Sequence, residues 1–182
     1  MLPKFITVIL MLSLASNSCF ADEAEDQANS FASIYASLCL KNLTNLGALR
    51  EQLKQVPALP QEKAEHFLAG NIGDAWPVPD KNGVFVLALL RDKPICLVYG
   101  RRANSEVARK LFTDLVTNAP SPLTTKQVLN EKAQTTANGE IQTVSYDWSV
   151  PNAPKNLLFT LSTAASETAD IQVLGSAAIV SP

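Results

Sequence analysis

The sequence has few of the residues from which most catalytic and metal centres are built. Among its 182 residues are one histidine, His66, and three cysteines, which excludes most zinc sites. No Gly-x-Ser-x-Gly elbow accompanies the histidine, and the glycines at 70, 73 and 83 form no nucleotide-binding motif. We therefore expect no metal, no cofactor, and a partly exposed surface role for His66. We also expect no enzyme, with an unobvious Ser-Lys or carboxylate site as the alternative.

Charge is sparse as well. The chain has 15 basic and 17 acidic residues, so its formal net charge is −2, and no strong field points to nucleic acid or acidic lipid. A hydrophobic fraction of 47% is typical of a folded globular chain. The length suits one domain, and no repeat or long linker divides it.

Long apolar runs are confined to the N-terminus. Residues 5–15 carry no charge, follow a short basic start and precede small and polar residues that end at Ala21. This is the pattern of a secretory signal peptide, and the run is shorter than the roughly 20 residues that span a bilayer. We therefore expect a signal peptide over residues 1–21, cleavage after Ala21, a single mature domain over residues 22–182 without a transmembrane segment, and a periplasmic location.

The three cysteines divide at the expected cleavage site. Cys19 lies before it and allows an outer-membrane lipoprotein as the alternative location, which is disfavoured because Ser16 and Asn17, unlike Ser18, fit a lipoprotein signal poorly. Cys39 and Cys96 remain, and an even pair in an exported chain predicts one disulfide, with two buried free thiols as the alternative. The bond requires Cα atoms within about 7 Å and would stabilise the fold by about 4 kcal/mol.

The periodicity of apolar residues predicts an α+β fold. Residues 22–69 have helical spacing in three segments, residues 71–82 form a proline-containing loop, and a helix starts at Asn104 or Ser105 and ends near Thr117. The expected strands cover residues 84–90 and 95–99, which form a hairpin, and then 124–132, 142–150, 157–161 and 171–179, the last with Gly175 as a candidate bulge. The order is three helices, a hairpin, a helix and three or four strands. We expect the helices to pack against one face of a largely antiparallel sheet.

Two features are candidates for partner binding. Trp76 lies between prolines on the expected loop, where an aromatic side chain is either a contact anchor or a lid over the core. Arg101, Arg102 and Arg109, with Lys110, follow the hairpin and could form a docking site for an acidic partner or a lipid surface. The alternative is ordinary solvation beside neighbouring acids.

Three stretches, at residues 70–79, 83–89 and 95–103, resemble a group of small exported proteins and lipoproteins of Gram-negative bacteria that have no assigned activity. The similarity covers roughly residues 30–120 and implies a Gram-negative envelope location. From the missing catalytic motifs, the expected disulfide, the constrained Trp76 and the arginine cluster, we expect a periplasmic, non-enzymatic module that binds a protein and no nucleic acid. An immunity-type inhibitor of a secreted antibacterial toxin is one concrete form, and an accessory or assembly component of an envelope machine is the alternative.

Overall fold

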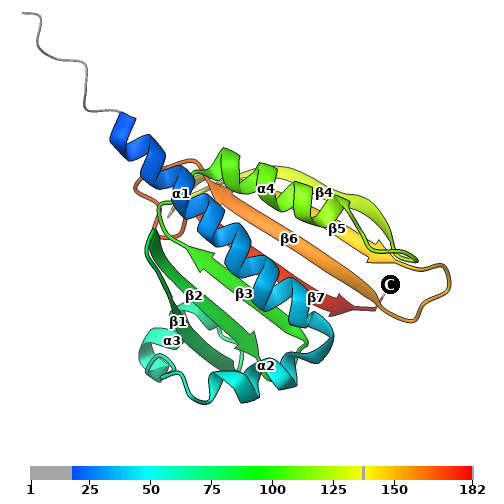
Figure 1. Cartoon of the computed structure of the whole chain (residues 1–182). Helices are drawn as coiled ribbons and strands as arrows, with labels where there is room; N and C mark the ends of the chain where they lie inside the picture. The colour runs from blue at the N-terminus through cyan, green and yellow to red at the C-terminus, as the bar shows by residue number, and fades with distance from the viewer. Residues whose placement is uncertain (1–17, 137, 182) are drawn as a thin grey trace, which may run out of the picture.

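A computed structural model describes residues 18–136 and 138–181 (Figure 1). The helical elements are α1 (Ser18–Ile34), the π-helical segment η1 (Tyr35–Leu40), the 3-10 turn η2 (Leu43–Asn45), α2 (Leu46–Leu53), α3 (Gln61–Leu68) and α4 (Ser105–Thr117). The strands are β1 (Gly73–Asp80), β2 (Gly83–Leu90), β3 (Ile95–Gly100), β4 (Thr124–Thr135), β5 (Gly139–Ser149), β6 (Asn156–Ala164) and β7 (Val173–Val180). The fold is therefore α+β, as the sequence predicts.

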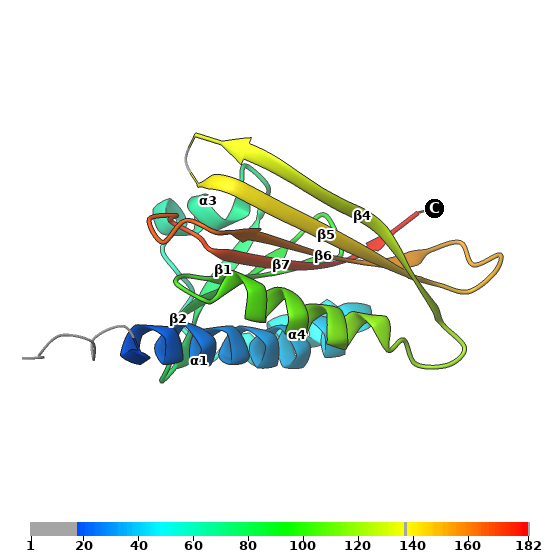
Figure 2. The same ribbon diagram turned by 90° about the horizontal axis from the view of Figure 1, so that it is seen from above.

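The strands form one antiparallel sheet in the order β1-β2-β3-β7-β6-β5-β4. The main core lies between one face of the sheet and the layer of α1, η1 and α4 (Figure 2). A smaller core lies on the opposite face, where Ala64 and Leu68 of α3 pack against β1 and β2. The expectation that all helices share one face is therefore wrong for α3.

The segment expected as a loop over residues 71–82 is instead strand β1, and Trp76 is buried in the main core with 6% of its surface exposed. Two prolines in this segment favour a loop, but proline is tolerated on an edge strand, and β1 is one. The Ala75 carbonyl points away from β2 and accepts a hydrogen bond from Leu59 N at 2.8 Å. Pro77 and Pro79 lie two and four positions after Ala75, so their backbone groups point in the same direction as those of Ala75. The nitrogens of both prolines therefore also point outward, so no ladder hydrogen bond is lost.

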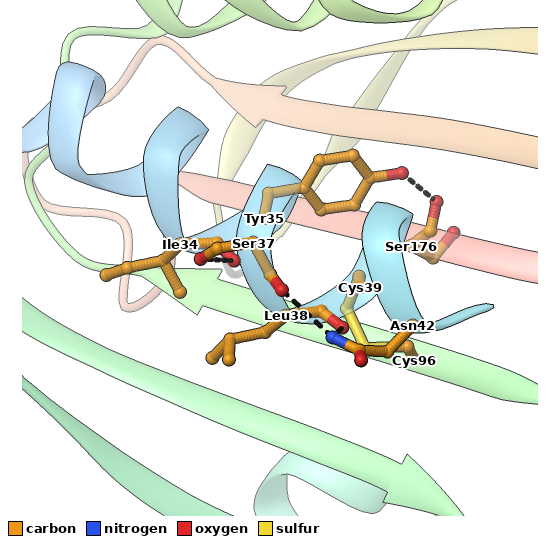
Figure 3. The surroundings of a disulfide bond; sticks show 8 residues. All are labelled: Ile34, Tyr35, Ser37, Leu38, Cys39, Asn42, Cys96 and Ser176. Carbon is orange, nitrogen blue, oxygen red and sulfur yellow. Dashed lines mark hydrogen bonds between the residues drawn. A yellow bond between two sulfur atoms is a disulfide. The ribbon is translucent and has the colours of Figure 1, made fainter. Parts of the chain in front are cut away.

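The predicted disulfide joins η1 to β3, with the Cα atoms of Cys39 and Cys96 5.4 Å apart (Figure 3). Gly175 on β7 forms no bulge, because β7 keeps an uninterrupted register with both neighbours. Its missing side chain instead makes room for the rings of Phe31 and Tyr35. The one register shift between β4 and β5 lies at Val128.

Residues 1–17 of the expected signal peptide lie outside the described residues. Helix α1 begins at Ser18, so its backbone includes Cys19 and the expected cleavage site after Ala21. Within the described ranges, no helix combines the length and the apolar character needed to cross a bilayer.

Candidate functional site

A cleft of about 530 Å³ opens at one end of the sheet, where three chain segments meet. These are the first turns of α1, the β3–α4 connection and the β6–β7 connection, which lie together at the end of the molecule opposite the C-terminus (Figure 1). The charged and amide residues that line the cleft are Glu23, Gln27, Arg102, Asn104, Glu106, Glu167 and Gln172.

Backbone hydrogen bonds fasten the three segments to one another. Asn104 N donates to Ala24 O at 2.9 Å, which holds the β3–α4 connection against α1. Gln172 N donates to Gly100 O at 3.2 Å, and Ala164 N donates to Gln172 O at 2.9 Å, which close the β6–β7 connection over the end of β3. The cleft therefore has walls held by paired backbone groups and is largely preformed.

A tight turn places Arg102 at the cleft. Its backbone adopts a left-handed conformation with φ of 69°, which is uncommon for a residue with a side chain. The next residue, Ala103, is buried in the main core. The Asn104 side chain then caps α4 by accepting from Glu106 N at 3.0 Å and Val107 N at 3.1 Å. The buried Ala103 and the capped start of α4 thus fix the backbone directly after Arg102, which holds Arg102 at the rim of the cleft.

The polar floor of the cleft includes two buried glutamines, Gln27 and Gln172. Gln172 Nε2 donates to Ser166 O at 2.9 Å. Gln27 Nε2 lies 3.4 Å from Glu23 Oε1, and Gln27 Oε1 has no hydrogen-bond partner. Such a group is uncommon in folded proteins. With three glutamates and one arginine among the lining residues, the formal charge of the cleft is 1 − 3 = −2.

A second hollow, a groove of about 360 Å³, lies between α4 and strands β4 and β5. Glu106 lines both the cleft and the groove, so the two flank the first turn of α4. Arg109 lies in the groove, where Nη1 donates to Gln142 Oε1 at 2.5 Å and Nη2 donates to the Glu106 carboxylate. The charge of Arg109 is thus paired inside the molecule.

The structure divides the basic cluster that the sequence suggested. Arg102 lines the cleft, Arg109 and Lys110 line the groove, and Arg101 is exposed and lines neither. Trp76, for which the sequence allows either a contact anchor or a lid over the core, is buried in the main core. The four basic residues are thus distributed over the cleft, the groove and the open surface, and a docking site for an acidic partner stays a prediction.

Sequence reasoning missed most of the cleft. Glu23, Gln27, Glu167 and Gln172 carry no motif, and more than 130 residues separate the first pair from the second. Only the pairing of β3 with β7 brings them to one end of the sheet. A signal existed for Gln27 alone, a polar residue four positions from Phe31 on the buried face of a helix.

Other candidate centres gain no support. His66 is exposed on α3 and makes an edge contact with the Phe67 ring at a centroid distance of 5.0 Å. Over residues 18–136 and 138–181, no three histidine, cysteine, aspartate or glutamate residues gather closely enough to hold a metal ion. Comparison of the chain with protein-family models, curated proteins and solved structures found no match.

Proposed function

We propose that this chain is a non-catalytic protein-binding module of the periplasm, and that the cleft receives a segment of its partner. The observation that carries this proposal is the cleft itself, a preformed hollow of about 530 Å³ with four charged lining residues on walls joined by backbone hydrogen bonds. Preformed walls favour binding because little conformational entropy is lost when a partner is captured.

The charges in the cleft favour a basic partner segment. Glu23 and Glu167 can each accept hydrogen bonds from a lysine or arginine side chain, whereas Glu106 is already paired with Arg109. Arg102 is the one cation among the lining residues. This proposal replaces the acidic partner that the arginine cluster suggested. An immunity-type inhibitor fits this chemistry, since an acidic surface can cover a basic substrate channel in a secreted toxin.

The periplasmic location has two supports. A disulfide that joins the helical layer to the sheet is typical of proteins from oxidising compartments. Cleavage after Ala21 would also start α1 at Asp22, so that four acids, at positions 22, 23, 25 and 26, lie in and beside its first turn. Acidic side chains there are stabilised by the helix dipole.

The experiment is capture with a chain tagged at its C-terminus, which lies at the end of the molecule away from the cleft (Figure 1). The bait is incubated with envelope and secreted fractions of its host, and stoichiometric partners are identified by mass spectrometry. The test variant is Arg102→Glu with Glu167→Lys, which keeps the net charge and reverses both sides of the cleft. The control is Lys63→Glu with Glu62→Lys, an equally neutral exchange of two exposed residues on α3.

The proposal expects one partner that the control retains and the cleft variant loses, and whose binding weakens as salt concentration rises. The identity of that partner then separates an inhibited toxin from an assembly component. A partner retained by the cleft variant would place the binding surface elsewhere. Edman sequencing of the bait tests export separately, with Asp22 as the expected first residue.

A further inference from the structure

The two edges of the sheet differ in how they are closed. The outer edge of β1 carries Pro77 and Pro79, and its Ala75 carbonyl is already bonded to Leu59. The opposite edge, β4, is a 12-residue strand without proline, exposed at every position except Leu129 and Thr135, which are half-buried. Within the described chain β4 pairs with β5 alone, so its other side presents backbone donors and acceptors to solvent.

The bulge at Val128 sets which side chains share a face. Gln127 and Asn130 lie opposite Tyr146 and Val144, both in the core beneath α4, so these two amides point to the helix side. Lys126 and Glu131 lie opposite Asp147 and Thr143 and therefore point to the other side. The bulge thus places an exposed cation and an exposed anion on the same face, five positions apart.

We propose that the β4 edge binds a second copy of this chain, strand against strand in antiparallel orientation. The two-fold axis passes between Val128 and Leu129 and stands perpendicular to the sheet. Lys126 then lies opposite Glu131 of the second copy, and the symmetry repeats this pair. Opposite residues of antiparallel strands lie within about 5.5 Å at their Cβ atoms, close enough for an ion pair.

The same register also gives the β4 residues between Lys126 and Glu131 suitable partners in the second copy. Gln127 lies opposite Asn130 of the second copy on the helix side, where the two amides can exchange hydrogen bonds. Val128, which is 49% exposed, lies opposite Leu129. In both copies two residues, 128 and 129, lie between Gln127 and Asn130, so the extra residue of one strand faces the extra residue of the other. Side chains that lie opposite each other across the axis therefore point to the same face of the sheet.

Neighbouring registers lack this match. A shift of two residues either way places Lys126 opposite Leu129 or Ala133. Lys132 faces the helix side and is already paired with Glu140 of the same chain at 2.9 Å. A lysine and a bulge on an edge strand normally discourage pairing with other chains, and of these registers this is the one that places a carboxylate of the second copy opposite Lys126. The edge is therefore selective for its own copy.

The resulting dimer has one continuous sheet made of two seven-stranded halves. The grooves beside α4 in the two copies meet across the axis, since Gln127 and Asn130 line them. No β4 residue lines the cleft, so both clefts stay open. The dimer is independent of the function proposed for the cleft.

Sedimentation velocity of the purified chain over a wide range of concentration tests the proposal. We expect a concentration-dependent dimer. Lys126→Glu and Glu131→Lys each place two like-charged pairs at the interface and should each weaken the dimer by about tenfold or more. The double variant Lys126→Glu with Glu131→Lys restores both ion pairs in reversed sense and should recover the affinity.

The matched control is Lys155→Glu, the same charge change at an exposed position in the β5–β6 turn, which should leave the dimer intact. Thermal unfolding of each variant reports whether the monomer still folds. A monomer at every concentration would overturn the proposal, as would a dimer that survives both single reversals. Failure of the double reversal to restore association would overturn it too, because the rescue depends on Lys126 facing Glu131.

Discussion

Substitution of Gly175 by alanine should destabilise the fold, although alanine is ordinarily the better residue inside a strand. Gly175 lies on β7 in the middle of the sheet, beneath α1 and η1. A Cβ atom there would lie 2.9 Å from Phe31 Cζ and 2.9 Å from Tyr35 Cδ2. Carbon atoms in contact prefer about 3.5–4.0 Å, so the helical layer would have to move by several tenths of an ångström.

The helical layer cannot move freely. Tyr35 donates its hydroxyl proton to Ser176 O at 2.8 Å (Figure 3). The Tyr35 ring also lies 5.5 Å from the ring of Phe112, measured between centroids. Four residues later, the Cys39 disulfide ties η1 to β3. We therefore expect Gly175→Ala to cost about 2 kcal/mol, in the range of overpacked cores, and to lower Tm by about 4–8 °C for a domain of this size.

Urea and thermal unfolding followed by tryptophan fluorescence measure the effect. Gly47→Ala is the matched control, because Gly47 is exposed on α2 and its nearest neighbour to an added Cβ is 3.8 Å away. Helix propensity should stabilise that variant by up to about 1 kcal/mol. Tyr35→Phe should reduce the penalty of Gly175→Ala by freeing the ring to shift. A Gly175→Ala protein as stable as the wild type would refute the steric argument.

Three further changes test other parts of the fold. Reduction of the Cys39–Cys96 bond, which spans 57 positions, should lower the free energy of unfolding by about 4 kcal/mol, measured by urea titration with and without reductant. Burial raises the pKa of Tyr99 to about 12 and that of Tyr35 well above its ordinary value near 10, so only the unfolded chain loses these protons above pH 10. The contribution of each tyrosine to the free energy of unfolding is therefore fully present below pH 10 and should fall by about 1.4 kcal/mol per pH unit up to pH 12. The variants Tyr35→Phe and Tyr99→Phe should each lack this slope. Trp148→Phe removes a hydrogen bond of 2.5 Å from Nε1 to a backbone carbonyl at the end of α4 and should cost about 1–3 kcal/mol by the same urea assay.

The parts of the fold that sequence predicts are those set by local chemistry. The sequence offers Asn104 or Ser105 as the start of α4, and the side chain of Asn104 accepts two amide hydrogen bonds there. Asn138-Gly139 is a common turn sequence in hairpins, and it lies where β4 ends and β5 begins. The apolar residues that alternate along β5, Val144, Tyr146 and Trp148, all lie in the main core, although Ser145 on the other face is buried as well. Each of these signals depends on a few adjacent residues, so the tertiary contacts of the folded protein do not alter the local structure that it predicts.

Signals that depend on distant neighbours failed. Two prolines in eight residues favour a loop, and only the position of β1 at the sheet edge makes a strand possible. Gly175 resembles a bulge because glycine weakens a strand, but its role is to admit rings from residues about 140 positions earlier. In both cases the reason for the residue lies in an element that the local sequence does not contain.

The arginine cluster shows why proximity in sequence is a weak guide to a binding surface. Arg102 and Arg109 lie seven positions apart, yet the first turn of α4 separates the cleft that holds one from the groove that holds the other. Glu106 lies between them and pairs with Arg109, so the helix that brings the arginines close also supplies the carboxylate that neutralises one of them. The acidic side chains that dominate the cleft arrive from α1 and the β6–β7 connection. The basic partner that we propose for the cleft therefore follows from the topology, whereas a charge count along residues 101–110 suggests an acidic one.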